Sequence, residues 1–183
     1  MTIFTIGHST RPAAELIALL RQSSVVLLVD VRSVPRSRAN PQFNAEALEP
    51  VLAEAGIGYH HLRSLGGLRH RRKDAPPSTN TLWRHDAFRN YADYAATQAF
   101  LEGLAALLEL ARTRCCAIMC AEAVWWRCHR RIIADYLLTC GVSVRHIMGP
   151  GKVDPATLTP GAEARPDGSL AYPASDSSEF RLV

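Results

Sequence analysis

The chain has 183 residues and a mass of 20.1 kDa, which suits one compact domain. An apolar fraction of 48% with 21% charged residues excludes a disordered or fibrous protein, and no apolar run approaches the roughly 20 residues of a membrane span. The formal net charge is +4. Because the first residues carry no signal-peptide pattern, we expect a cytoplasmic protein with no membrane partner.

Positive charge is concentrated in one part of the chain. Residues 63–90 hold seven cations and two acids, a net charge of +5 that exceeds the +4 of the whole chain. All but two of the 21 cations are arginine, whose planar fork grips phosphate or carboxylate at two points. A GC-rich genome would also favour arginine, so the distribution is more informative than the total. It predicts an anionic ligand, with nucleic acid as one candidate.

Periodicity and turn residues predict an alternation of strands and helices. The expected elements, in chain order, are a strand over 3–6, a helix over 13–21, a strand over 25–31, a helix over 45–55, a strand over 57–62, a helix over 91–112, a strand over 115–120, a helix over 128–139 and a strand over 142–147. This order predicts a three-layer α/β fold: a mostly parallel, five-stranded, Rossmann-like sheet with helices on both faces.

The predicted organisation is one α/β domain followed by a tail. The domain covers residues 1–148 and includes a basic loop over 63–90, which shows no sustained periodicity. Residues 149–183 are rich in Gly, Pro, Ser and Asp. They are expected to form an irregular tail packed on the domain, with room for one short added strand.

Polar residues follow every predicted strand. Ligands of open parallel sheets bind outside the carboxyl ends of the strands, so these residues are expected to meet at one edge. They are His8 and Ser9, Asp30 and Arg32, Arg63 with Gly66 and Gly67, Cys120 and Glu122, Cys128 with His129 and Arg130, and His146.

The segment from Cys120 to Arg131 is the most distinctive, with the sequence CAEAVWWRCHRR. Cys128 is predicted at a helix start, where unpaired backbone N–H groups and the helix dipole lower the pKa of a thiol. Arg127, Arg130 and Arg131 add positive charge. These features favour a functional role for Cys128 as thiolate, ligand or hydrogen-bond donor. Cys120, at a strand end, is better explained as an inert buried thiol.

Two interpretations stay open for the residues after the first two strands. Asp30 and His8 could be acid or base groups and Arg32 an anion clamp. Asp30 could equally accept hydrogen bonds from its own loop, with Arg32 as its ion partner and His8 in a structural role.

The cysteines and the missing motifs narrow the chemistry. Five cysteines, an odd number without a Cys-x-x-Cys spacing, argue against a disulfide framework, a zinc ribbon or a thioredoxin-type motif. Thiolate and imidazole groups suit zinc or iron, but neighbouring Cys128 and His129 on a helix would point about 100° apart. No metal is therefore assigned. The P-loop, the dinucleotide fingerprint and the Gly-x-Ser-x-Gly elbow are absent from the sequence.

Four ordered motifs resemble a known family. They are Thr5-Ile-Gly-His-Ser9, Asp30-Val-Arg-Ser-x-Pro-x-Ser37, Leu65-Gly-Gly67, and Cys120-Ala-Glu122 with Cys128-His-Arg130. Over about residues 3–147 the chain is similar to the prokaryotic family known as domain of unknown function 488. The resemblance implies a cytoplasmic α/β protein that carries these motifs, and it implies no reaction.

The sequence favours an enzyme that acts on a phosphate-bearing substrate, either a nucleotide or nucleic acid. Its expected anion- or substrate-binding residues are Ser9, Arg32, Arg63, Gly66, Gly67, His129 and Arg130, and its expected catalytic groups are Asp30, Glu122, Cys128 and His8. A non-catalytic nucleic-acid-binding module and a thiol- or metal-dependent redox protein are the alternatives. The sequence identifies no cofactor and no oligomeric state.

Overall fold

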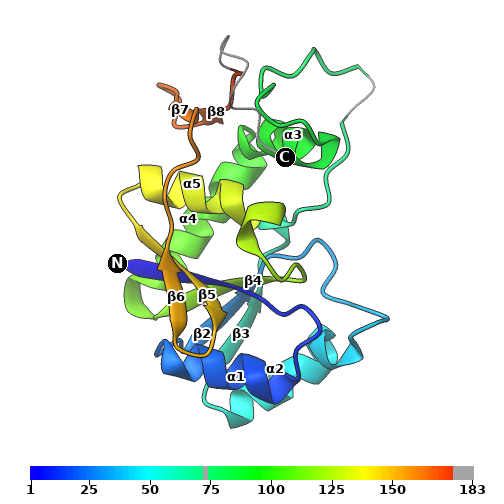
Figure 1. Cartoon of the computed structure of the whole chain (residues 1–183), viewed down its shortest axis with the longest axis vertical. Helices are drawn as coiled ribbons and strands as arrows, with labels where there is room; N and C mark the ends of the chain where they lie inside the picture. The colour runs from blue at the N-terminus through cyan, green and yellow to red at the C-terminus, as the bar shows by residue number, and fades with distance from the viewer. Residues whose placement is uncertain (72–73, 175–183) are drawn as a thin grey trace.

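The computed structural model describes residues 1–71 and 74–174, which form one sheet covered by helices on both faces and a small hairpin (Figure 1). The strands are β1 (Thr2–Gly7), β2 (Leu27–Asp30), β3 (Gly58–His61), β4 (Cys116–Cys120), β5 (Ser143–Gly149), β6 (Lys152–Pro155), β7 (Glu163–Ala164) and β8 (Leu170–Ala171). The α-helices are α1 (Ala13–Gln22), α2 (Ala45–Glu54), α3 (Asp86–Ala95), α4 (Gln98–Thr113) and α5 (Arg130–Thr139). Three short 3₁₀ helices are η1 (Pro41–Phe43), η2 (Arg63–Leu65) and η3 (Trp125–Arg127).

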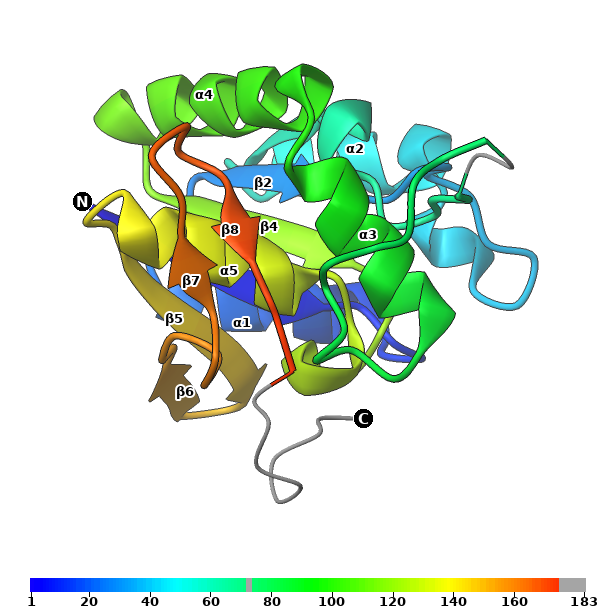
Figure 2. The ribbon, with the colours of Figure 1, turned by 90° about the horizontal axis from the view of Figure 1, so that it is seen from above.

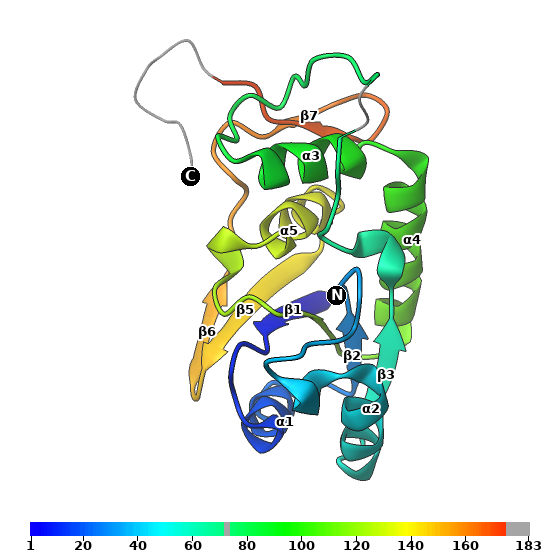
Figure 3. The ribbon, with the colours of Figure 1, turned by 90° about the vertical axis from the view of Figure 1, so that its right-hand side faces the viewer.

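The main sheet has the strand order β3-β2-β4-β1-β5-β6, and its first five strands are parallel. Helices α1 and α2 cover one face and α4 and α5 the other, with α3 outside α5 (Figure 3). The expected three-layer, mostly parallel α/β fold is thus confirmed. The sheet has six strands rather than five, because Lys152–Pro155 turns back and pairs antiparallel with β5. Gly151, at a φ of 66°, makes that turn possible.

Alternate strand positions feed two separate cores. In β4, Cys116, Ile118 and Cys120 belong to the core under α4 and α5, whereas Ala117 and Met119 belong to the core over α1 and α2. This is the period of two expected for a strand that is buried on both faces. Because side chains alternate between the two faces, the position of a polar residue along its strand decides on which face of the sheet it lies.

The single helix expected over 91–112 is instead two helices, α3 and α4. Thr97 separates them: its backbone is extended, and its hydroxyl donates a hydrogen bond to the Tyr94 carbonyl. Its own carbonyl accepts from the Phe100 N–H in the first turn of α4. Threonine is a favoured residue at a helix start, so this break carried a signal in the sequence. Because α3 begins at Asp86, the loop after η2 is also shorter than expected.

The segment after β6 crosses α5 and ties down the loop that precedes α3. Asp135 of α5 accepts hydrogen bonds from the Thr159 N–H at 2.8 Å and the Tyr172 hydroxyl at 3.0 Å. The Tyr172 backbone then binds Asn80 and Leu82 in the loop. Figure 2 shows β7 and β8 lying across α5.

The expected boundary between residues 148 and 149 falls one residue before the end of β5, and residues 175–183 of the expected tail lie outside the described residues. In the described part of the chain, no helix is both long enough and apolar enough to cross a bilayer.

Candidate functional site

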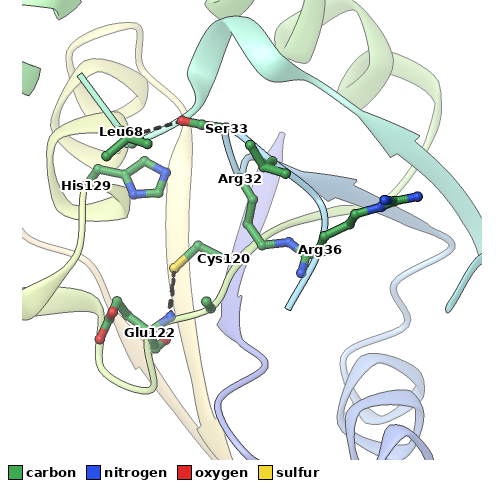
Figure 4. A pocket seen from close by; sticks show the side chains of 10 residues that line it. Arg32, Ser33, Arg36, Leu68, Cys120, Glu122 and His129 are labelled. Carbon is green, nitrogen blue, oxygen red and sulfur yellow. Dashed lines mark hydrogen bonds between the residues drawn. The ribbon is translucent and has the colours of Figure 1, made fainter. Parts of the chain in front are cut away.

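Two adjoining pockets open at the carboxyl ends of the central strands. The larger has a volume of about 380 Å³ and is lined by residues 32–34, Arg36, Gly67, Leu68, residues 120–122 and His129. The smaller, of about 210 Å³, is lined by Gly67, residues 87, 88 and 91, Glu122 and residues 127–129. Gly67, Glu122 and His129 line both. Figure 4 shows Cys120 and His129 in the larger pocket, with Arg32 and Arg36 further across it.

A pair of thiols lies between these pockets. The sulfur atoms of Cys120 and Cys128 are 2.8 Å apart, and both residues are buried. Cys120 ends β4 and lines the larger pocket, while Cys128 precedes α5 and lines the smaller one. The sulfur of Cys128 also accepts the backbone N–H of Arg130 at 3.4 Å, so the start of α5 stabilises negative charge there. This agrees with the helix-start position expected for Cys128.

The His129 ring is fixed by its neighbours. Its Nε2–H donates to the Val31 carbonyl at 3.0 Å, which leaves Nδ1 to face the Cys128 sulfur at 3.4 Å. Gly67 packs against the other side: a Cβ on this glycine would lie 2.3 Å from His129 Nδ1. Gly67 therefore has to be a glycine for the ring to keep this position. The backbone of Cys128 is extended and that of His129 is already helical, and at this junction the Cys128 sulfur and His129 Nδ1 come together instead of diverging.

Arg130 is a buried cation whose charged neighbour is sulfur. It is 1% exposed, and its Nε donates to the Cys128 sulfur at 3.4 Å. Its Nη2 donates to the Glu122 carbonyl at 2.7 Å. Among the described residues, no carboxylate oxygen lies within ion-pair distance of this guanidinium. A buried guanidinium needs a counter-charge, and the Cys128 thiolate is the group that supplies one.

The two thiols differ in acidity because of these contacts. Burial alone would raise the pKa of Cys128, but the hydrogen bond from Cys120 and the positive charges of His129 and Arg130 together hold this pKa well below that of an ordinary thiol. Burial, with the neighbouring Cys128 charge, raises the pKa of Cys120 well above it. The pair therefore carries one negative charge, located on Cys128.

Cys120, Cys128 and His129 could also offer three ligand atoms to a metal, since these atoms all lie within 4.8 Å of one another. Two thiolates bound to one zinc ion at about 2.3 Å each would be about 3.8 Å apart. The observed sulfur separation of 2.8 Å is about 1 Å shorter. Binding of zinc by both sulfur atoms would therefore require them to move apart.

A second buried cluster lies at the carboxyl ends of β1 and β2. The Nε of Arg32 donates to both oxygens of Asp30, at 2.9 and 3.0 Å, and Tyr59 donates to the same carboxylate at 2.8 Å. His8 donates from Nδ1 to the Ser9 carbonyl and accepts from Arg32 at Nε2, 3.3 Å away. Burial, with a smaller contribution from the Arg32 charge, lowers the pKa of His8, so its ring stays neutral. These contacts match the second interpretation of the sequence, in which Arg32 is the ion partner of Asp30 and His8 has a structural role.

The remaining predicted site residues lie at different depths. Glu122 is exposed and lines both pockets. Ser9 binds the backbone of Ala121, and Gly66 packs against Ser33, so both shape the pocket edge without lining it. Arg63 is exposed in η2 and lines neither pocket.

Several lining residues were not predicted. Arg36, Val34 and Leu68 of the larger pocket and Phe88 and Tyr91 of the smaller one are among them. Val34 and Leu68 are large apolar residues that are 57% and 65% exposed, respectively. Leu68 directly follows the predicted Gly67 and Val34 lies two residues after Arg32, and that position is the signal that could have identified them.

A third histidine lies behind the thiols. His146 forms a hydrogen bond of 2.8 Å with the Thr5 hydroxyl and stacks on Trp125 at 4.3 Å. Its Nε2 is buried without a hydrogen-bond partner. Burial, together with the Arg130 charge, lowers the pKa of His146 to about 4. His146 therefore contributes no positive charge near the thiolate at neutral pH.

Comparison with known proteins places the chain in a family. No curated protein and no solved structure matches it. One family model matches residues 12–137, the part of the chain that holds both thiols, both buried arginines and Gly67. The chain therefore belongs to the family described as Domain of unknown function DUF488.

Proposed function

We propose that this protein is an enzyme that uses the Cys128 thiolate as a nucleophile on a phosphate-bearing substrate of nucleotide size. The observation that carries the proposal is the contact between the Cys128 sulfur and the buried Arg130 guanidinium, at 3.4 Å. Because Arg130 lacks a carboxylate partner among the described residues, folding favours the ionised thiol. The thiolate is the nucleophilic form of cysteine.

The lining of the pockets supports an anionic substrate. Arg32, Arg36 and Arg127 line them, against Glu122 as the acidic lining residue. The charge of Arg32 is largely offset by the buried Asp30. Arg36 is paired with the exposed Glu46, at 3.2 Å, in a weak surface ion pair, and Arg127 is exposed, so these two arginines are the stronger candidates for binding phosphate. A pocket of about 380 Å³ suits a mononucleotide, whose base could cover the exposed side chains of Val34 and Leu68.

The geometry also suggests how the residues would divide the work. The Cys128 sulfur would attack an electrophilic atom of the substrate and form a covalent bond to it as the bond to the leaving group breaks. A proton on His129 Nδ1, which lies 3.4 Å from this sulfur, would pass to the leaving group. Water would then cleave the bond to sulfur and restore the thiolate. Glu122, exposed at the junction of the pockets, is placed to accept a proton from that water.

A nucleic-acid-binding module without catalysis has less support. The guanidinium of Arg69 stacks on Tyr94 at 3.7 Å, and its Nη2 donates to the Arg63 carbonyl. Arg71 similarly donates to the backbone of its own loop. These arginines of the basic loop use part of their N–H donors within the loop, so fewer donors are left for a phosphate backbone.

Alkylation kinetics test the nucleophile. We expect iodoacetamide to modify Cys128 at neutral pH faster than the exposed Cys140, because the contact with Arg130 holds Cys128 as the thiolate, the form that is alkylated. In an Arg130→Met variant, alkylation of Cys128 at pH 7 should slow by up to about tenfold for each unit by which its pKa rises above 7. Mass spectrometry of the modified peptides measures both rates. Equal rates at Cys128 and Cys140 in the unmodified chain would contradict the proposal.

A substrate screen tests the rest. Thermal shift against nucleotides and other phosphate esters identifies ligands, and turnover is then measured on those that bind. We expect Cys128→Ser to abolish turnover and to leave binding largely intact, whereas the matched surface variant Cys140→Ser should change neither. Turnover that survives Cys128→Ser would exclude this residue as the nucleophile.

A further inference from the structure

The two buried thiols need little movement to form a covalent bond. Their sulfur atoms are 2.8 Å apart, and a disulfide requires about 2.05 Å. Cys120 is fixed at the end of β4, and Cys128 lies just before α5, so the approach is less than 1 Å and leaves both elements in place. Nucleophilic catalysis by Cys128 does not itself require a second thiol at this distance.

We propose that Cys120 and Cys128 form a reversible disulfide when hydrogen peroxide oxidises Cys128, and that this bond protects and inactivates the nucleophile. The inference goes beyond the proposed function, since it would hold for any substrate of the pocket. Cys128 is assigned as the residue that reacts first and Cys120 as the one that resolves the product.

Oxidation proceeds in two steps, each balanced in atoms and electrons. The Cys128 thiolate attacks one oxygen of hydrogen peroxide, so an S–O bond forms, the O–O bond breaks, and the hydroxide that leaves takes up a proton as water. The sulfur is now a sulfenic acid, oxidised by two electrons. The Cys120 thiol then loses its proton and attacks the Cys128 sulfur, so an S–S bond forms and the S–O bond breaks. The second hydroxide takes up the Cys120 proton and also leaves as water.

Arg130 makes this disulfide easy to reduce. In the reduced protein the buried guanidinium has the Cys128 thiolate beside it, at 3.4 Å. Formation of the disulfide removes that negative charge and leaves Arg130 without a counter-charge. A disulfide whose reduced form is stabilised in this way is a strong oxidant, so glutathione should reopen it.

The other cysteines lack this arrangement. Cys116 is buried, its sulfur is directed to the Arg114 carbonyl at 3.4 Å, and burial raises its pKa to about 11. Cys115 contacts the Ser23 carbonyl, and burial raises its pKa as well. Cys140 is exposed just after the far end of α5. Cys140 is therefore the matched control, because peroxide reaches it but the thiol pair is elsewhere.

The experiment treats the full-length protein with hydrogen peroxide and maps its cysteines by mass spectrometry. Trypsin separates residues 115–127 from residues 128–130, so the expected bond links two peptides, and fragmentation distinguishes Cys120 from Cys115 and Cys116. We expect this crosslink in the unmodified chain and in Cys140→Ser, and its loss on treatment with glutathione. In Cys120→Ser we expect a sulfenic acid on Cys128 that dimedone traps, and in Cys128→Ser neither product.

Several outcomes would overturn the inference. One is a Cys128 that goes directly to sulfinic acid in the unmodified chain, with no crosslink. Another is a stoichiometric release of zinc on thiol modification, which would make the pair metal ligands. Because the crosslink is measured in the unmodified chain, a variant that fails to fold does not weaken the test. A Cys128 that alkylates rapidly but never crosslinks would leave the proposed function standing and this inference rejected.

Discussion

Two stretches of the chain share one local plan. In Asp30-Val-Arg32 and in Cys128-His-Arg130, an acidic group precedes an arginine by two residues and accepts both the backbone N–H and the Nε–H of that arginine. Both pairs are buried, and both lie at the same edge of the sheet. Each has a histidine nearby that burial keeps neutral, His8 in one case and His146 in the other.

The difference between the pairs lies in the remaining contacts. The Asp30 carboxylate is also bound by Tyr59, and Arg32 also donates to the Phe43 carbonyl. Asp30 is therefore fully enclosed, and only its partner Arg32 lines the larger pocket. The Cys128 sulfur instead has a second thiol and an imidazole beside it and lines a pocket. The same backbone arrangement thus holds an enclosed carboxylate in one place and, in the other, a sulfur anion that lines a pocket.

The largest expected effect on stability comes from removing Asp30, the anion of the first pair. Asp30→Ala leaves Arg32 buried without a charged partner and should lower the free energy of unfolding by about 3 to 5 kcal/mol. Cys128→Ala should cost less, because the neighbouring Cys120 can ionise and face Arg130 in its place. Urea denaturation of both variants measures the difference. Equal losses would mean that the two pairs play the same structural role.

Acid should unfold the protein partly through His146. Its pKa is about 4 in the folded chain and about 6.5 in the unfolded one, so the unfolded chain takes up the proton first. The contribution of His146 is fully present above pH 6.5 and is lost as the pH falls toward 4, by about 3 kcal/mol in total. The unfolding free energy of His146→Gln should therefore depend less on pH across this window. Parallel pH profiles for the variant and the unmodified chain would refute this assignment.

A smaller effect on stability is expected from a change at Gly67, which packs against His129 beside the thiol pair. In Gly67→Ala the new Cβ meets His129 Nδ1 and moves the ring away from Cys128, at a cost of about 1 to 3 kcal/mol from overpacking. Alkylation of Cys128 should slow as well. Gly149→Ala is the matched control, since a Cβ there meets no atom within 4 Å. A normal alkylation rate in Gly67→Ala would show that His129 does not set the reactivity of the thiol.

Much of the fold was predictable from local patterns. The buried runs around β2 and β4 and the helices α1, α2 and α5 follow from periodicity and from glycine or proline at their ends. The division of the helix at Thr97 was not predicted, and the short strand allowed in the tail was given neither a position nor a partner in the sheet. The first depends on one hydroxyl-to-carbonyl hydrogen bond, and the second on pairing with β5 across a tight turn.

The site was predictable in place more than in detail. Strand ends located the edge at which Cys120, Glu122 and Cys128 converge, because parallel strands bring their carboxyl ends together. Sequence spacing gave no means of seeing that Cys128 is extended, so the convergence of its sulfur with His129 was missed. The sequence also assigned Cys120 as an inert buried thiol; the structure confirms its burial and adds that its sulfur lies 2.8 Å from that of Cys128.

The segment that crosses α5 also affects the shape of the smaller pocket, which it does not itself line. Through Asn80 and Leu82 it braces the loop before α3, and α3 supplies Phe88 and Tyr91 to one wall of the smaller pocket. The family model ends at residue 137, before this brace begins. A chain that shares the matched part and differs beyond it would therefore keep the thiol pair but surround it with a differently shaped entrance.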